Sequence, residues 1–392
     1  MEEEEEAKHR RRDRQKNDQG LARHRTNKSG KSQEQQQQQP GPTDQERNPH
    51  KPFNMWAVAR LKAQRPLGEW LGMTIYTFIG ISSNFAAVTS SNEAGTMETQ
   101  YWAWGFATMI GKSSPVRCSY PPQKPTPFPI NERKQDTPSN LPPGIYISGG
   151  SSGAFINPAL IITLTIFRGF PWPRVPTYIL IQILGAFCGA LLAFSVHRDS
   201  ILYLDNNALV PDSTGVSMYT QPRDWIRPST ALTTELLGSA VLTCTIMALG
   251  DSGNSPPGAG MHALIIGLVV TATSMALSYP TRGCFNPARD LGPRLAALAV
   301  GYPPSIFSAW HSWWIWGGWV APIVGALIGA LAYDLCVFKG GESPVNYSVS
   351  RWRNKTLKGE RNLLKKALRS SRHKAVERRL ESGGVVVRED RR

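Results

Sequence analysis

Two parts of the chain, residues 69–194 and 235–334, repeat one order of sequence features. Each part opens with a glutamate, Glu69 or Glu235, three residues before a glycine in a long apolar stretch. Each part then contains an Asn-Pro box, "FINPAL" or "FNPARD", and closes with a glycine-rich apolar stretch, "ILGAFCGALLAF" or "IVGALIGALAYD". The fold must therefore place two related halves about one pseudo-two-fold axis.

The lengths of the apolar stretches predict how often each half crosses a bilayer, since a crossing helix needs roughly 20 apolar residues. In the second half, two full-length stretches come before a short stretch and a further full-length one. The first half has the same order, except that its second stretch is interrupted. We predict an all-α membrane protein with six transmembrane helices plus two re-entrant half-helices. Three crossings are an odd number, so the second copy is inverted. The full-length stretches are 67–90, 175–196, 229–250, 260–279 and 313–338, the interrupted one begins at 101–111, and the short ones are 156–167 and 285–300.

The excess positive charge of the chain lies entirely in its two ends. Residues 1–65 hold 15 Lys+Arg and 10 Asp+Glu, residues 339–392 hold 16 and 6, and residues 66–338 hold 13 of each. Because positive residues gather on the cytosolic side of membranes, both termini are expected in the cytosol. The division is a disordered N-terminal tail (1–65), a membrane domain (66–338) and a basic C-terminal tail (339–392). A soluble nucleic-acid-binding protein is excluded by the number and length of the apolar stretches.

A polar block, residues 112–144, interrupts the second crossing. Glu69 precedes Asn157 by 88 residues and Glu235 precedes Asn286 by 51, so removal of these 33 residues leaves 88 − 33 = 55 and nearly equalises the halves. The block carries seven charges and nine prolines, which cannot continue a helix through lipid. Both of its ends can be encoded by intron boundary sequences in one codon phase. We therefore predict a retained intron; the alternative is a genuine loop extruded from the membrane.

The two Asn-Pro-Ala boxes carry the functional expectation. Each opens an apolar helix too short to cross, with asparagine at a favoured cap position and proline at the first turn. In an inverted repeat the two half-helices meet by their N-termini, each with about half a positive charge. Two asparagine amides would then donate to one water, which could not also accept a proton from a neighbouring water. The expectation is a pore for small neutral molecules. The boxes are Asn157-Pro158-Ala159 and Asn286-Pro287-Ala288.

These features together resemble the major intrinsic proteins, the aquaporins and aquaglyceroporins. The resemblance covers about residues 66–338 and implies a homotetramer with one pore per subunit in a lipid bilayer. It implies that Arg289 is the selectivity arginine and that Trp104, 20 residues before Asn157 once the block is removed (157 − 104 − 33), is the aromatic wall of the filter. Asp290 and Arg294 resemble the glycerol-conducting branch.

Other filter and supporting positions follow from the same resemblance. Either Gly283 or Cys284 is implied as the third filter position, and Ser274 or Met275 as the fourth. Phe155 departs from the histidine usual before the first box, and Gly318-Trp319 match neither the glycerol nor the water branch. The buried polar residues Glu69, Glu235 and Gln182 are implied to brace the half-helix loops.

The function expected from the sequence is a passive channel for glycerol and water that excludes ions and protons. Two alternatives stay open: a water-selective pore of the same fold, and a non-conducting membrane protein if block 112–144 is real. No catalytic residue, cofactor, metal site or nucleic-acid partner is predicted, and an enzyme is not expected. The long tails and the short intron favour a fungal plasma membrane.

Overall fold

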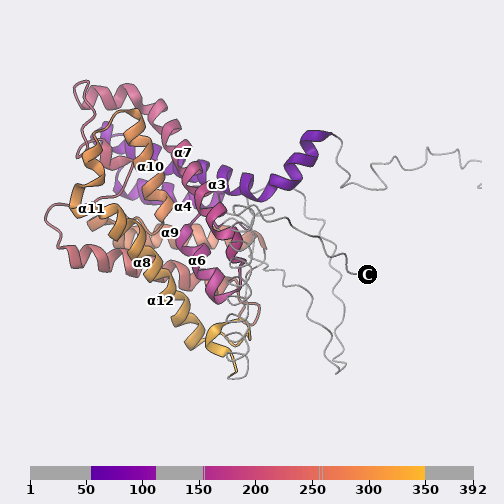
Figure 1. Ribbon diagram of the computed structural model, residues 1–392. Helices are drawn as coiled ribbons and strands as arrows, with labels where there is room; N and C mark the ends of the chain where they lie inside the picture. Colours follow the sequence, from indigo (N-terminus) through magenta and orange to yellow (C-terminus); the bar gives the residue numbers. More distant parts are fainter. Residues whose placement is uncertain (1–53, 112–152, 154, 256, 258, 349–392) are drawn as a thin grey trace, which may run out of the picture. The chain divides into compact units, whose positions relative to one another are not determined.

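The computed structural model describes residues 54–111, 153, 155–255, 257 and 259–348, and the secondary structure of this part is helical. The predicted intron, 112–144, lies outside the described residues, as do most of both predicted tails. The α-helices (Figure 1) are α3 (Met55–Thr89), α4 (Met97–Gly111), α6 (Pro158–Phe167), α7 (Val175–Leu204), α8 (Pro228–Leu249), α9 (Ala259–Thr281), α10 (Pro287–Val300), α11 (Ala309–Ile315) and α12 (Ala321–Cys336). Short helical turns are η1 (Trp172–Arg174), η2 (Gly215–Ser217), η3 (Pro304–Phe307), η4 (Trp316–Val320) and η5 (Pro344–Asn346).

Within the described residues, five helical segments are long and apolar enough to cross a membrane. The half-length stretch is α4, whose last residue, Gly111, directly precedes the polar block. The two predicted half-helices are α6, with 10 residues, and α10, with 14. The all-helical membrane fold predicted from the sequence is confirmed. The five spans are Ala63–Thr89, Trp172–Leu204, Pro228–Leu249, Met261–Thr281 and Ala309–Cys336.

Three helices differ from their predicted bounds. Helix α3 begins at Met55, inside the segment assigned to a disordered tail. Helix α7 continues to Leu204, past the predicted end at residue 196, because Ile201, directly after the polar residues 197–200, is buried in the apolar core. The last span is irregular: left-handed residues 310–312 precede the π-helix η4 and then α12.

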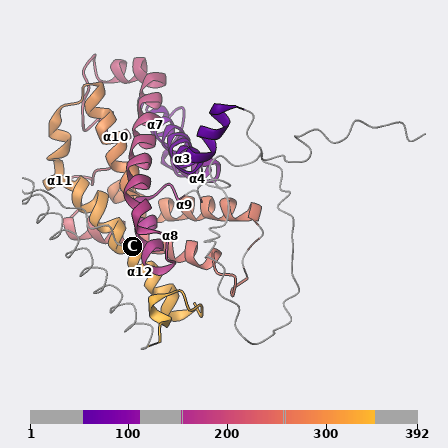
Figure 2. The same cartoon turned by 45° about the vertical axis from the view of Figure 1, so that its right-hand side comes forward.

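The inverted repeat is visible in the helix contacts. Two pairs of glycines, each spaced by four residues, let one helix touch the backbone of another, which is a common packing mode in membranes. A Cβ atom at any of them would stand 2.1–2.6 Å from a carbonyl oxygen. In each half, the two carbonyl oxygens belong to the residues one and five positions after the glutamate, Glu69 or Glu235. The two halves therefore use matched positions. The pairs are Gly185 with Trp70, Gly189 with Thr74, Gly325 with Leu236 and Gly329 with Ala240; α8 and α12 lie side by side in both views (Figures 1 and 2).

Replacing Gly329 by alanine is expected to reduce the stability of the fold by about 1–3 kcal/mol, the usual effect of overpacking. The added methyl carbon would lie 2.1 Å from the carbonyl oxygen of Ala240, so α12 must move away from α8. The measurement is the midpoint of thermal aggregation in detergent, followed by size-exclusion chromatography. The control is Leu331→Ala on the exposed face of α12. An unchanged midpoint for Gly329→Ala would contradict the close packing.

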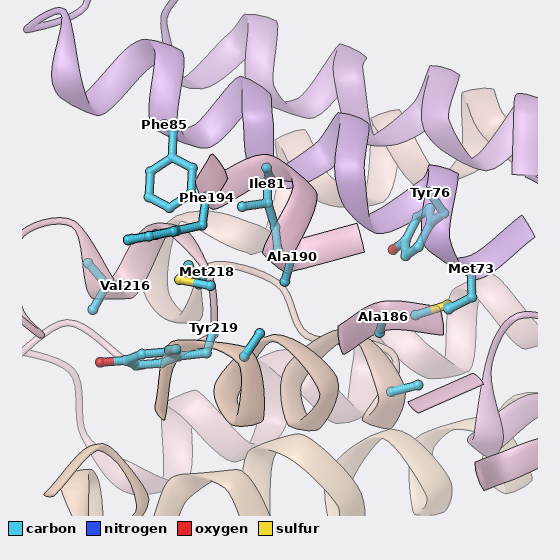
Figure 3. Close-up of a cluster of buried hydrophobic side chains, with 14 of the residues drawn as sticks. Met73, Tyr76, Ile81, Phe85, Ala186, Ala190, Phe194, Val216, Met218 and Tyr219 are labelled. Atoms are coloured by element: carbon cyan, nitrogen blue, oxygen red, sulfur yellow. The ribbon is translucent and has the colours of Figure 1, made fainter. Parts of the chain in front are cut away.

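The largest buried apolar cluster joins α3, α7 and the loop before α8. In Figure 3, Phe85 of α3 points toward Phe194 of α7, and Met218 and Tyr219 of the loop lie beneath them. Met218 and Tyr219 are completely buried. This cluster anchors the loop, which the functional site uses.

Candidate functional site

The two half-helices meet at their N-terminal ends and are tied together by their asparagines. Nδ2 of Asn157 donates to the carbonyl oxygen of Phe285 at 3.0 Å, and Nδ2 of Asn286 donates to that of Ile156 at 2.7 Å. Each Oδ1 accepts the backbone N–H two residues on, from Ala159 or Ala288, at 2.9 and 3.1 Å. Each asparagine therefore caps its own helix and holds the loop that precedes the other.

The backbones of the two boxes are nearly identical. The φ and ψ angles are −153° and 116° at Asn157 and −154° and 111° at Asn286. The residue before each asparagine, Ile156 or Phe285, has a positive φ, 42° and 46°. This left-handed conformation is unfavourable for side chains of that size, so the surroundings must hold it in place.

Two buried glutamates hold these strained loops. Glu69 accepts the backbone N–H groups of Phe155 and Ile156, both at 2.9 Å, and the Nε2 group of Gln182 at 2.8 Å. Glu235 accepts the N–H groups of Cys284 at 3.0 Å and Phe285 at 2.9 Å, the matched positions in the second half. Each glutamate thus accepts two consecutive backbone N–H groups of the loop that precedes one half-helix.

Both asparagines line one cavity of about 300 Å³. On α9 the lining residues recur every fourth position from Ile266 to Ser278, a distance of about 18 Å along a helix. Exposed Asn92 stands at one end, and the asparagines lie further in. The cavity is therefore an elongated passage that runs past the tips of both half-helices. Lining residues include Tyr76, Asn84, Trp104, Phe155, Leu242, Ile246, Val270 and Ser274.

Trp104 forms one wall of the passage, and Arg289 stacks behind it. The Cζ atom of Arg289 lies 4.4 Å from the centre of the indole ring, and its Nη1 donates to the carbonyl oxygen of Met218 at 2.9 Å. The indole N–H donates to Oδ1 of Asn84 at 3.3 Å, and Nδ2 of Asn84 donates to the carbonyl oxygen of Ser217 at 2.9 Å. The adjacent carbonyl groups of Ser217 and Met218 thus position two side chains: that of Ser217 positions Trp104 through Asn84, and that of Met218 positions Arg289.

Asp290 lies behind the passage. It accepts the N–H and the hydroxyl of Thr220 at 2.8 and 2.6 Å, and it pairs with Arg294 at 2.9 Å. Gly318 packs against it, where a Cβ would lie 3.1 Å from Oδ2. This contact gives a reason for the glycine at a position that matched neither branch.

The structure brings some of the predicted filter residues to the cavity and leaves others behind it. Trp104, Asn157, Gly283, Cys284 and Asn286 line it, and so does Ser274, whereas Met275 is exposed and outside the lining. Buried residues that support the wall without lining it are Pro158, Ala159, Pro287, Ala288, Arg289, Asp290, Glu69, Glu235 and Gln182.

Among the lining residues that the sequence analysis did not single out are Asn84, Arg223 and Arg282. Arg282 had a visible signal, since it stands four residues before Asn286 in "TRGCFNP". Asn84 and Arg223 had none, because their place in the cavity depends on contacts with distant segments.

Comparisons with known proteins agree with this geometry. Residues 140–333 match the family described as major intrinsic protein. The chain is similar to aquaglyceroporin-4 of Botryotinia fuckeliana (42% identical over 317 residues, 78% of this chain and 39% of that protein). It is also similar to an aquaglycerol porin of Saccharomyces cerevisiae (38% over 295 residues, 75% and 41%). The chain thus spans only about two fifths of the length of these two relatives.

Two further comparisons cover most of the other protein. An aquaporin of Laccaria bicolor is 30% identical over 294 residues, 74% of this chain and 85% of that one. The X-ray structure of the aquaglyceroporin from Plasmodium falciparum shares the fold, with a TM-score of 0.56, 21% identity, and coverage of 70% of this chain and 96% of that one. With its paired asparagine boxes meeting inside one bundle, the chain belongs to the major intrinsic protein family.

Proposed function

We propose that this protein is a passive membrane channel for glycerol, water and other small neutral solutes. The observation that carries the proposal is the pair of asparagine amides lining one passage. Each amide has two N–H donors, and one of them is bound to the opposite loop. The second can face the passage and bind a water or a solute hydroxyl. The names of the fungal relatives support glycerol as a permeant.

Exclusion of ions and protons follows from the same geometry. A water that accepts hydrogen bonds from both asparagines has no lone pair left for a proton from its neighbour. The positive ends of α6 and α10 both point at this position, which repels cations. Among the described lining residues there are arginines but no carboxylates, so a permeating cation finds no counter-charge.

The setting of the channel is also proposed. Outward-facing leucines on several helices suit contact with lipid tails, for example Leu180 and Leu192 on α7 and Leu237 on α8. We propose a homotetramer in the plasma membrane with both basic tails in the cytosol, which the family resemblance and the charge distribution support. Cross-linking in native membranes and protease access to the tails would check these points.

The direct test uses the full chain in liposomes and follows their volume by stopped-flow light scattering. Folded protein is expected to raise both water and glycerol permeability above that of empty liposomes, with no increase in proton leak measured by an internal pH dye. Glycerol permeability equal to that of empty liposomes, with rapid water flux, would favour the water-selective alternative. No flux of either solute would favour the non-conducting one.

Replacing Trp104 by alanine is expected to widen the passage and relax its selection by size. The indole is mostly buried, packs edge-on against Tyr76 at 5.0 Å, and lines the same cavity as Gly283 and Ser274. Six-carbon polyols such as sorbitol should then permeate several-fold faster than through the natural protein. Replacing Trp102, on the exposed side of α4, by alanine is the control and should change nothing. Unchanged sorbitol flux in Trp104→Ala would contradict a filter role.

A further inference from the structure

The mouth of the passage carries more positive charge than the paired-asparagine site needs. Arg223 and Arg282 both line the cavity, on the side of exposed Asn92. They come from separate segments, the loop before α8 and the loop between α9 and α10. Arg282 is within electrostatic range of both Arg223 and Arg289, so three guanidinium groups share one small region.

This charge is not neutralised by the described part of the chain. The ion pairs of the described residues use Arg168, Arg198 and Arg294, and no described carboxylate lies within 4 Å of Arg223 or Arg282. Asp212 acts on Arg282 from a longer distance, but it is exposed and accepts a hydrogen bond from Gln221. The described lining contains no aspartate or glutamate.

One of the two arginines is held in a fixed position, while the other has free donors. Nε of Arg223 donates to the carbonyl oxygen of Tyr279 at 3.0 Å, and its Cζ lies 4.4 Å from the centre of the Tyr279 ring. The backbone N–H of Arg282 donates to the carbonyl oxygen of Ser278 at 2.7 Å, while none of the described hydrogen bonds uses its guanidinium group. A planar guanidinium with unused N–H donors matches the oxygens of phosphate or carboxylate groups.

We propose that this mouth is a binding site for a small oxyanion, with Arg282 and Arg223 as its ligands and inorganic phosphate as a fitting occupant. The half-buried position strengthens the attraction relative to an arginine in bulk water. A bound phosphate stands at the entrance to the passage, ahead of Trp104, and obstructs solutes that enter there. The site makes solute flux sensitive to the oxyanion concentration on that side of the membrane.

Binding is measured first without any transport, so that its outcome does not depend on the proposed channel function. Purified full-length protein in phosphate-free buffer is titrated with inorganic phosphate by isothermal calorimetry at constant ionic strength. Arg282→Gln and Arg223→Gln are each expected to weaken binding at least about tenfold, because each removes a charge-assisted contact. Arg282→Lys should retain part of the affinity for phosphate, since lysine keeps the positive charge but lacks the planar set of N–H donors of the guanidinium group.

Flux is measured second, with each variant compared with its own value in chloride. Phosphate is expected to slow glycerol and water entry through the natural protein and to have little effect on the double variant Arg223→Gln/Arg282→Gln. Arg198→Gln, an exposed change on α7, is the matched control and should behave as the natural protein. Glycerol phosphate added in place of phosphate shows whether an attached polyol strengthens binding. Equal phosphate affinity in the natural protein and the double variant, or no binding by either, would overturn the proposal.

Discussion

Replacing Arg294 by methionine is expected to destabilise the fold by about 3–5 kcal/mol, the usual effect of removing one partner of a buried ion pair. Arg294 is 1% exposed and its partner Asp290 is 0% exposed. Its Nε and Nη2 groups bind Asp290 at 3.0 and 2.9 Å, Nη2 also binds the carbonyl oxygen of Thr220 at 2.7 Å, and Nη1 binds that of Ile306 at 2.6 Å. The substitution would leave a buried carboxylate and two carbonyl groups without this donor.

The substitution Arg294→Met should change permeation through the passage as well as the stability of the fold. Thr220 lies two residues after Met218, whose carbonyl oxygen positions Arg289. Loss of Arg294 is therefore expected to loosen the loop that positions Arg289 and, through Asn84, Trp104. The checks are the thermal aggregation midpoint in detergent and the ratio of glycerol to water permeability in liposomes. Arg198→Met, at a side chain that is 60% exposed, is the control. A midpoint within a degree or two of the natural protein would contradict this account.

A double variant distinguishes the cost of leaving Asp290 buried without a partner from the loss of the other hydrogen bonds of Arg294. Replacing Asp290 by leucine together with Arg294→Met removes both buried charges, and such exchanges are often far less harmful than loss of one partner. We expect the double variant to be more stable than Arg294→Met alone. If both variants were equally unstable, the bonds of Arg294 to Thr220 and Ile306 would carry most of the stabilisation.

The two half-helices and the glutamates before them could be predicted from the sequence because each motif occurs twice, at matched positions of the repeat. One Asn-Pro-Ala box is an ordinary helix start, but two boxes at matched positions, each behind a glutamate, specify a re-entrant pair. The helix contacts repeat this symmetry at Gly189 and Gly329. Features that repeat in both halves could therefore be read from periodicity and spacing.

Features unique to one half could not be read in this way. The positioning of Trp104 by Asn84, and of Arg289 by Met218, depends on the long loop that joins the two repeats and occurs only once between them. The left-handed residues before α12 and the extension of α7 to Leu204 likewise come from tertiary packing. Arg282 was visible, but its role at the mouth required knowing that Arg223, distant in sequence, faces the same cavity.

Replacing Glu235 by alanine is expected to destabilise the protein by about 3–5 kcal/mol and to abolish solute flux. The change leaves the backbone N–H groups of Cys284 and Phe285 buried without their acceptor, and each unpaired group costs about 1–3 kcal/mol. It also releases Phe285 from a left-handed conformation with a φ of 46°. The carbonyl oxygen of Phe285 is the acceptor for Asn157, so relaxation of this loop separates the two half-helix tips.

The matched change Glu69→Ala tests whether the two halves are equivalent. Glu69 holds Phe155 and Ile156 as Glu235 holds Cys284 and Phe285, so both variants should lose folded protein to a similar extent. Glu93→Ala, in the exposed loop between α3 and α4, is the control. Folded yield after detergent extraction and glycerol flux in liposomes are the measurements. Full flux through either variant would show that the two half-helix tips stay together without the carboxylate, and would contradict a role for these glutamates in setting the geometry of the passage.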